Sequence, residues 1–337
     1  MPKLRLSFIS GFNERVDPLM KGIVEAEGIE LLPSYSPPSE TFWRQLRYQE
    51  FDVGEMSMSS YLIARERGFD LIALPVFPSR RLFHTELSYH TDSGIKKPED
   101  LVGKRIGVGE YQQTAALWQR GILEHDFGVS QYKVHWYMER TLELSHGGAT
   151  GFTPPPGISF QRIPPEKSMM SMLVNHELDA AAINSPWMST PSIIGRSHGT
   201  PSEGGDWSKV KILFPDRVAE GMRFFKKWGF LPVNHAYTIR GDIYKKYPWV
   251  AFNLYTGFVK AKQHFNAKLV DSIPTALFFG REYLAMTREM FGDDPYPYGV
   301  KGNRKMIETL IDFSHEQGLT TKKMKAEELF AESTLEL

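Results

Sequence analysis

Short apolar strands alternate with amphipathic helices along most of this chain, and that alternation constrains its fold more than any other feature. Leu4, Leu6 and Phe8 alternate with polar residues, as in a strand with one buried face. Periodicity and turn residues predict further strands at 29–32, 52–56 and 71–76, and helices at 16–24, from Ser39 onward and at 59–67. Repeated alternation of this kind is typical of parallel sheets joined by crossover helices.

The alternation restarts after a polar break at 91–100. Strands are predicted at 105–108, 134–137 and 178–183, and helices at 112–127 and 169–176. Two stretches rich in proline or glycine, 147–165 and 191–206, predict long loops rather than helices. The last third instead has helical periodicity around 249–259, 276–290 and 305–317.

A restarted alternation predicts a second lobe, and terminal helices usually pack back on an earlier sheet. We therefore expect an α/β fold of two lobes, each a mostly parallel sheet flanked by helices. Lobe one would comprise residues 1–88 and 236–337, and lobe two residues 89–235. The 337 residues are enough for two hydrophobic cores of ordinary size.

Composition argues against several classes of partner. Lys and Arg together number 40, and so do Asp and Glu, so the chain has no basic surplus for nucleic acid. No apolar run reaches the roughly 18 residues of a membrane span, and the first residues lack the pattern of a secretory signal. These observations predict a cytoplasmic protein without a nucleic-acid or membrane partner, and they leave a homo-oligomer open.

The absence of cysteine excludes disulfides, thiolate nucleophiles and thiolate metal ligands. The 10 histidines are scattered along the chain, and none has the spacing typical of a metal-ligand pair. We therefore predict no metal site from the sequence.

Three polar segments follow predicted strands, where open α/β sheets bind their ligands. The first contains Glu55 and then the hydroxyls of Ser57, Ser59 and Ser60 at a helix start. Hydroxyls and free N–H groups at a helix N-terminus suit a carboxylate or phosphate. The alternative is that these serines only cap the helix.

The other two segments add charged groups. Arg80 and Arg81, followed by His84, could hold and protonate an acid, since arginine pairs a carboxylate with two parallel hydrogen bonds. The alternative is a solvated loop with one arginine in a salt bridge. The third segment opens the helix at 112–127 and offers Glu110, Tyr111, Gln112 and Thr114. A lone histidine, His235, is by itself more often structural than catalytic.

Motifs along nearly the whole chain, in the same order, resemble those of the 4,5-dihydroxyphthalate decarboxylase family. They are the run Phe51-Asp52-Val53-Gly54-Glu55-Met56-Ser57-Met58-Ser59-Ser60-Tyr61-Leu62, then 75–80 with His84, 103–108 through 110–112, His235, 248–251, 297–299, 303–304 and 314–319. The sequence departs from the family at Gly109, where proline is common, and at 82–83, where Leu82-Phe83 replaces a Phe-Arg pair.

The resemblance implies a fold like that of type 2 periplasmic binding proteins, with the site in the cleft between two lobes. It also implies a carboxy-lyase that converts a small anionic aromatic substrate, 4,5-dihydroxyphthalate, to protocatechuate and carbon dioxide without an organic cofactor. The alternative is a non-catalytic solute-binding protein for a small aromatic or aliphatic acid.

Loss of carbon dioxide from an aromatic ring needs an acid at the ring carbon, a base at a ring hydroxyl and cations at the carboxylate. We expect Arg80 to clamp a carboxylate, with Arg81 as a second candidate. His84 and His235 are the candidate acids, because an imidazole titrates near neutrality. Glu55 or Glu110 would be the base if closure of the lobes desolvates it. The remaining substrate contacts would come from the following polar side chains: Ser57, Ser59, Ser60, Tyr111, Gln112 and Thr114.

Overall fold

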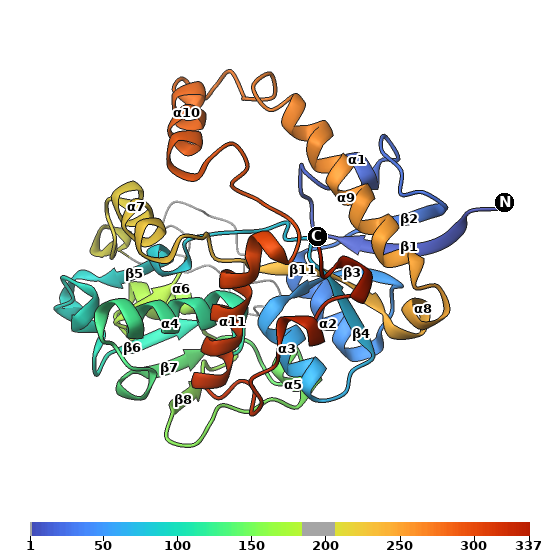
Figure 1. The fold of residues 1–337 in the computed structure, drawn as a ribbon. Helices are drawn as coiled ribbons and strands as arrows, with labels where there is room; N and C mark the ends of the chain where they lie inside the picture. Colours follow the sequence, from blue (N-terminus) through green and yellow to red (C-terminus); the bar gives the residue numbers. More distant parts are fainter. Residues whose placement is uncertain (1, 184–205) are drawn as a thin grey trace.

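The strands of the chain form two sheets in a two-lobed α/β fold (Figure 1). This is a computed structural model, and it describes residues 2–183 and 206–337. Within those residues, one sheet has five strands and the other has six.

The first sheet has β1 and β3 near its centre and mixes parallel with antiparallel pairs. Its order is β2 (Ile29–Tyr35), β1 (Leu4–Ser10), β3 (Val53–Ser57), β11 (His235–Arg240) and β4 (Leu71–Leu74). β1 runs parallel to β2 and β3, whereas β11 is antiparallel to both of its neighbours. Apolar side chains on one face pack against α9 (Trp249–Ala267), where the rings of Tyr237 and Phe258 stack at 4.5 Å.

The second sheet is also mixed. Its order is β10 (Val210–Ile212), β5 (Leu87–His90), β9 (Ala180–Ala182), β6 (Arg105–Val108), β7 (His135–Met138) and β8 (Ser159–Arg162). The four strands from β9 to β8 are parallel, and β5 and β10 are added antiparallel at the edge. The α-helices described between β5 and β11 are α4 (Thr114–Phe127), α5 (His146–Thr150), α6 (Met169–Val174) and α7 (Arg217–Trp228).

Three helices join the two sheets through one apolar core. α3 (Met58–Glu66), α4 and α11 (Arg304–Glu316) contact one another, and α11 lies in front of the junction in Figure 1. Trp118 of α4 packs edge-on against Phe313 of α11, with ring centroids 5.5 Å apart. The same core contains side chains from strands of both sheets, so burial of apolar surface holds the lobes together.

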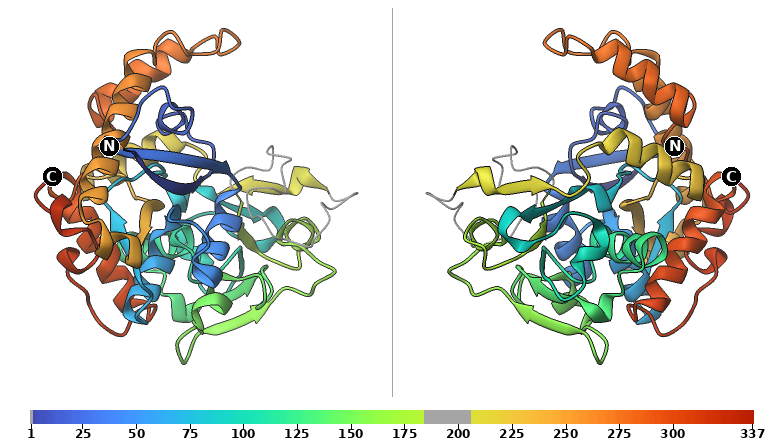
Figure 2. Two further views of the ribbon diagram at one scale, coloured as in Figure 1. Left: turned by 90° about the vertical axis from the view of Figure 1, so that its right-hand side faces the viewer. Right: turned by 90° about the vertical axis from the view of Figure 1, so that its left-hand side faces the viewer.

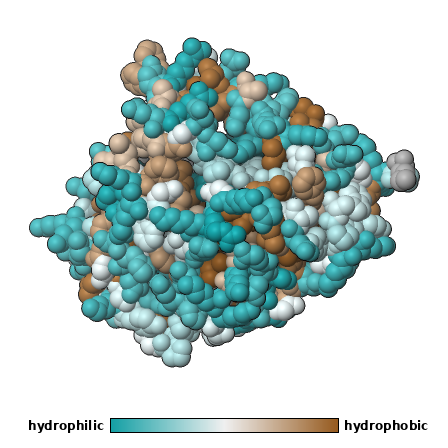
Figure 3. All heavy atoms as spheres, in the orientation of Figure 1, coloured by the Kyte–Doolittle hydropathy of each residue, from teal (hydrophilic) through white to brown (hydrophobic). Residues whose placement is uncertain are grey.

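An arm of residues 268–297, which includes α10 (Gly280–Phe291), projects from the body in all three ribbon views (Figures 1 and 2). No α10 residue is buried, and Leu277, Phe278 and Phe279 are all largely exposed. Figure 3 shows apolar side chains at the top of the molecule, where this arm lies. Whether a second copy of the chain covers it is untested, and a homo-oligomer stays a prediction.

Most of the predicted elements are confirmed, with differences where local conformation overrides the pattern. The helix expected at 16–24 is only α1 (Asp17–Met20), because Gly22 adopts a left-handed conformation with φ of 68°. The long loop expected at 147–165 is wrong in part, since it contains most of α5 and all of β8. The second expected loop, 191–206, lies almost entirely outside the described residues.

Strands up to β4, together with β11, belong to the first sheet, and strands from β5 to β10 belong to the second. The proposed division after residues 88 and 235 cuts through β5 and leaves the first residue of β11 in lobe two. The ranges of the two lobes therefore stay a prediction. Two further helices contact strands of the first sheet: α2 (Pro38–Tyr48) and α8 (Gly241–Lys246). No helix among the described residues combines the length and the apolar character that a membrane span requires.

Candidate active site

A cavity of about 480 Å³ lies between the two sheets. The first sheet contributes Glu55 and Ser57 from β3 and His235 from the start of β11. The opposite wall includes Gly109, just after β6, and Thr114, the first residue of α4. Because β3 and β11 are paired neighbours, residues far apart in sequence reach this space together.

A carboxylate and an imidazole form the most chemically distinctive pair in the cavity. His235 Nδ1 donates to Glu55 Oε1 at 2.6 Å, and both side chains are largely buried. The ring of Phe42 packs edge-on against the imidazole at 4.6 Å. No hydrogen bond from a described residue reaches His235 Nε2. The pair therefore fixes the ring and leaves one nitrogen for a ligand.

Glu55 is ionised despite its burial. Burial by itself raises the pKa of this carboxyl, but the neighbouring His235 and the hydrogen bonds from Gly11 and Ser10 outweigh it, and the pKa lies below its usual range. The Gly11 N–H donates to Oε2 at 2.8 Å. An ionised Glu55 stabilises positive charge that develops on the imidazole during proton transfer.

Two arginines line the cavity, each paired with a carboxylate. Arg81 lines it and donates to Glu86 Oε2 at 2.7 Å, while its Nε makes no hydrogen bond with the described residues. Arg140 also lines the cavity, from the segment after β7, and is bound to Glu110. These guanidinium groups can hold carboxylates, whose geometry they match.

Glu110 does not line the cavity, and it supports residues that do. Its buried carboxylate accepts from Arg140, from the Gln112 side chain and from the backbone N–H of His146. Burial opposes ionisation, but His146 and Arg140 lower the pKa of Glu110 below its usual value. The Glu110 carboxylate is therefore already occupied by hydrogen bonds inside the protein. This argues against Glu110 as the base and for a role in positioning Arg140.

Hydroxyl groups also line the cavity. Ser57 and Thr114 both line it, and their hydroxyls lie 2.9 Å apart. The backbone N–H of Ser59 donates to Thr114 Oγ1 at 3.0 Å. This contact joins the start of α3 to the start of α4, so the N-termini of two helices meet beside the cavity. The positive ends of the two helix dipoles there favour an anion.

The prediction that Arg80 clamps a carboxylate is corrected by its contacts. Its buried guanidinium donates to the backbone oxygens of Leu231 and Pro297, each at 2.9 Å, and to the side chain of Asn303. Arg80 is not among the residues that line the cavity. It joins the segment before β11 to the segment between α10 and α11, and Arg81 is the arginine that reaches the cavity.

His84 is likewise placed elsewhere than we predicted. It is fully buried between Phe214 and Phe224, and its Nε2 donates to Glu220 Oε1 at 2.6 Å. Burial opposes ionisation of Glu220, but the hydrogen bonds from His84 and Arg223 lower its pKa to about 2. Since His84 does not line the cavity, His235 remains as the candidate acid.

The remaining predicted contacts lie behind the cavity wall. Tyr111 donates to Gln131 at 2.7 Å, and Ser59 and Ser60 are fully buried. Of the side chains that the sequence missed, Arg140, His146 and Phe42 line the cavity. Arg140 and His146 flank a short polar loop before α5, and no periodic pattern marks such a loop from the sequence.

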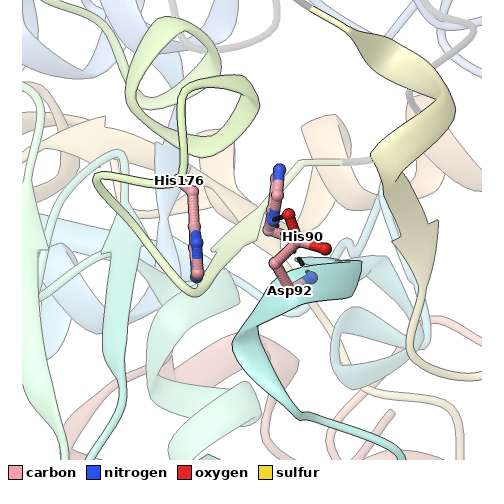
Figure 4. Close-up of side chains that lie close together, drawn as sticks. All are labelled: His90, Asp92 and His176. Carbon is pink, nitrogen blue, oxygen red and sulfur yellow. Dashed lines mark hydrogen bonds and ion pairs between the residues drawn. The ribbon is translucent and has the colours of Figure 1, made fainter.

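Apart from the cavity, the described residues contain one group of potential metal ligands: His90, Asp92 and His176 (Figure 4). The cavity itself has no such group among the described residues. The metal-ligand spacing absent from the sequence is therefore produced by tertiary structure, since His176 lies far along the chain from the other two.

Two curated proteins are similar in sequence to this chain. A curated 4,5-dihydroxyphthalate decarboxylase of Comamonas testosteroni is 30% identical over 339 residues, covering 100% of this chain and 99% of that protein. The chain belongs to the 4,5-dihydroxyphthalate decarboxylase family. A second member, from Pseudomonas putida, is 37% identical over 181 residues, covering 53% of this chain and 70% of that protein.

The family shares its fold with periplasmic binding proteins. Residues 11–191 match the family described as "ABC transporter, phosphonate, periplasmic substrate-binding protein". The aliphatic sulphonate binding protein SsuA of Escherichia coli superposes with a TM-score of 0.55 at 15% identity, with 100% of both chains covered. The alkanesulfonate-binding SsuA of Xanthomonas axonopodis gives 0.53 at 14% identity, covering 96% of each chain. These likenesses confirm the predicted fold class.

Proposed function

We propose that this chain is a carboxy-lyase that converts 4,5-dihydroxyphthalate to protocatechuate and carbon dioxide without an organic cofactor. The names of its curated relatives support the reaction class. The observation that carries the proposal is the Glu55–His235 pair, which presents a free imidazole nitrogen to a cavity that two arginines also line. A proton source beside cations is what this reaction requires.

The chemistry begins at the ring carbon that bears the carboxylate. Direct departure of carbon dioxide would leave an aryl anion, which is too unstable to form readily. A hydroxyl para to that carbon donates electron density toward it through the ring and keeps its own proton. An acid then protonates the carbon, the C–C bond to the carboxylate breaks, and its electron pair restores aromaticity. The ring carbon keeps the new proton.

His235 is the proposed acid. Its Nδ1–H is held by Glu55, so Nε2 is the nitrogen that faces a ligand. The ionised Glu55 stabilises the imidazolium before transfer and fixes the ring orientation, as the carboxylate does in a hydrolase triad. Phe42 packs against the same imidazole, so its rotation is restricted on two sides.

Arg81 and Arg140 are the proposed carboxylate ligands. They line one cavity together with the first residues of α4. A substrate with two neighbouring carboxylates would have one group to react and one to anchor it. The anchored group fixes the ring relative to His235, and correct orientation contributes a large share of the rate in reactions of this kind.

The test is release of carbon dioxide from 4,5-dihydroxyphthalate by the purified protein. We expect turnover by the wild type and a decrease of about a hundredfold or more in His235→Gln, the usual scale for a positioned acid. Substrate affinity should change less, because glutamine still donates a hydrogen bond. His125→Gln is the matched control, since His125 is exposed and pairs with Glu316 away from the cavity. Normal turnover by His235→Gln would refute the assignment.

A second candidate is a binding protein for a small acid. It is favoured by the fold, because the SsuA neighbours are sulphonate-binding proteins by name. A binding protein needs the arginines but has no use for a proton donor aimed at a ring carbon. Tight binding of phthalate-type acids without any release of carbon dioxide would favour this candidate.

A further inference from the structure

Three side chains with metal-ligating atoms meet at the end of the second sheet that is remote from the cavity. His90 ends β5, Asp92 follows it, and His176 lies in the turn after α6 (Figure 4). One ligand atom from each lies within 4.8 Å of the others. None of the three lines the cavity or enters the proposed reaction.

We propose that His90, Asp92 and His176 form a binding site for a divalent transition-metal ion, with Zn²⁺ as the metal that fits the ligands best. Two imidazoles and one carboxylate are a ligand set that zinc and cobalt share. Three protein ligands leave room for water on the metal. Asp92 has 53% of its side chain exposed, so an ion can enter from solvent.

Two of the three ligands already face one another. His90 Nδ1 faces Asp92 and accepts a hydrogen bond from its backbone N–H at 3.2 Å, which a metal ion at this nitrogen would replace. The Asp92 carboxylate Oδ2 lies 3.9 Å from that nitrogen. Metal–ligand bonds of about 2.0–2.2 Å place two ligand atoms on one ion roughly 3.0–3.6 Å apart. A small rotation of the exposed carboxylate closes this gap.

The third ligand requires one ring to turn. The imidazoles of His90 and His176 are stacked, with centroids 4.4 Å apart and planes 10° from parallel. An ion must lie in the plane of each ring that binds it, so the stacked rings cannot share one as they stand. The ring that turns is His176, whose side chain is 31% exposed, and turning it gives up the contact of its Nε2 with Asp179 Oδ1 at 3.3 Å.

A cation of the protein already contacts the proposed ligands. Lys209 Nζ lies 2.8 Å from Asp92 Oδ2. A metal ion would have to displace this ammonium from the carboxylate. Removing Lys209 should therefore strengthen metal binding, an effect that a structural histidine pair would not produce.

The experiment titrates Co²⁺ into full-length protein previously treated with a chelator, and follows the visible absorption of bound cobalt. We expect one Co²⁺ per chain, displaced by Zn²⁺. Asp92→Asn, at an exposed position, and His176→Gln, at a half-buried one, should each weaken binding at least tenfold. Lys209→Ala should strengthen it several-fold. His125→Gln, a histidine outside the cluster, should leave it unchanged.

Thermal unfolding gives an independent readout, since an ion that binds only the folded state raises its stability. Zn²⁺ should raise the unfolding temperature of the wild type but not of His176→Gln. The proposal is overturned if the wild type binds no stoichiometric Co²⁺. It is also overturned if Asp92→Asn and His176→Gln bind Co²⁺ as tightly as the wild type does. If Lys209→Ala binds Co²⁺ with unchanged affinity, Asp92 is not a ligand and the three-residue site is wrong.

Discussion

Arg80 and Arg81 are neighbours of one chemical type, yet their surroundings assign them different roles. Arg80 is buried and donates to two backbone carbonyls and to Asn303. We expect Arg80→Ala to lower the free energy of unfolding by about 3 kcal/mol, because the buried acceptors lose their donor. Arg81 has 37% of its side chain exposed, so Arg81→Ala should change stability by less than about 1 kcal/mol.

For ligand binding we expect the reverse order, with Arg81→Ala more affected than Arg80→Ala. Arg81→Ala should weaken the binding of phthalate, which lacks the reactive hydroxyls, by about 1.5–3 kcal/mol. Urea unfolding and calorimetric titration measure the two quantities. Equal effects of both substitutions on phthalate affinity, with both proteins folded, would contradict the assignment.

Glu220 gives a prediction for stability at low pH. Its pKa is about 2 in the folded protein, below the ordinary value of 4.5, so folding favours its charged form. Its contribution to stability is therefore fully present above about pH 4.5 and is lost as the pH falls toward 2. Glu220→Gln should destabilise the protein by about 2 kcal/mol near neutrality. The difference between the variant and the wild type, followed by urea unfolding, should shrink below pH 4.5.

Residue types could be predicted from the sequence more readily than residue roles. Two of the candidates named from the sequence, Glu55 and His235, do line the cavity. The same reasoning chose Arg80 and His84, whose side chains turn into the protein. Which way a side chain points depends on packing that no local pattern records. The sequence therefore offered Arg80 and Arg81 without deciding between them, and Arg140 was found only in the structure.

At the scale of elements, the close contact of α4 with α11 depends on Gly121. A methyl group there would overlap the ring of Phe313, which Trp118 and Trp228 also contact. Alanine gains about 1 kcal/mol in helix propensity. An overlap with a ring that cannot move costs roughly 3 kcal/mol, the upper end for overpacked cores. We therefore expect Gly121→Ala to destabilise the protein by about 2 kcal/mol.

Gly302→Ala is the matched control, because no atom of the described residues lies within 4 Å of a methyl group there. Its free energy of unfolding should change by less than about 0.5 kcal/mol. Urea unfolding of both variants gives the comparison. A Gly121→Ala protein as stable as the wild type would show that α4 and α11 can separate without cost.

Long periodic helices and most strands could be predicted, but the antiparallel edge strands of the second sheet could not. The pattern at 249–259 identified α9 and that at 305–317 identified α11. β5 and β10 were missed, because no apolar run marks them and they form by pairing with each other and, for β5, with β9. The mixed character of both sheets follows from such pairings, which a sequence-based expectation of parallel strands does not include.

At the scale of the whole molecule, the cavity exists because distant segments are adjacent. Glu55 and His235 are separated by 180 residues, yet β3 and β11 pair directly. β11 is also the segment that returns the chain to the first sheet. The candidate site and the return crossing are thus one feature. The residue pattern predicted a return near residue 236, but only the structure showed that it pairs β11 with β3.

The shared core predicts that the two lobes unfold together. It contains Met56 and Ala236 from the first sheet and Ile106 and Trp136 from the second, so unfolding one lobe would expose apolar surface of the other. We expect one calorimetric transition whose van't Hoff and calorimetric enthalpies agree. Phthalate at a hundred times its Kd should move that whole transition, adding about 2.7 kcal/mol. Two transitions, of which phthalate shifts only one, would mean that the lobes are independently stable and that α3, α4 and α11 do not couple them.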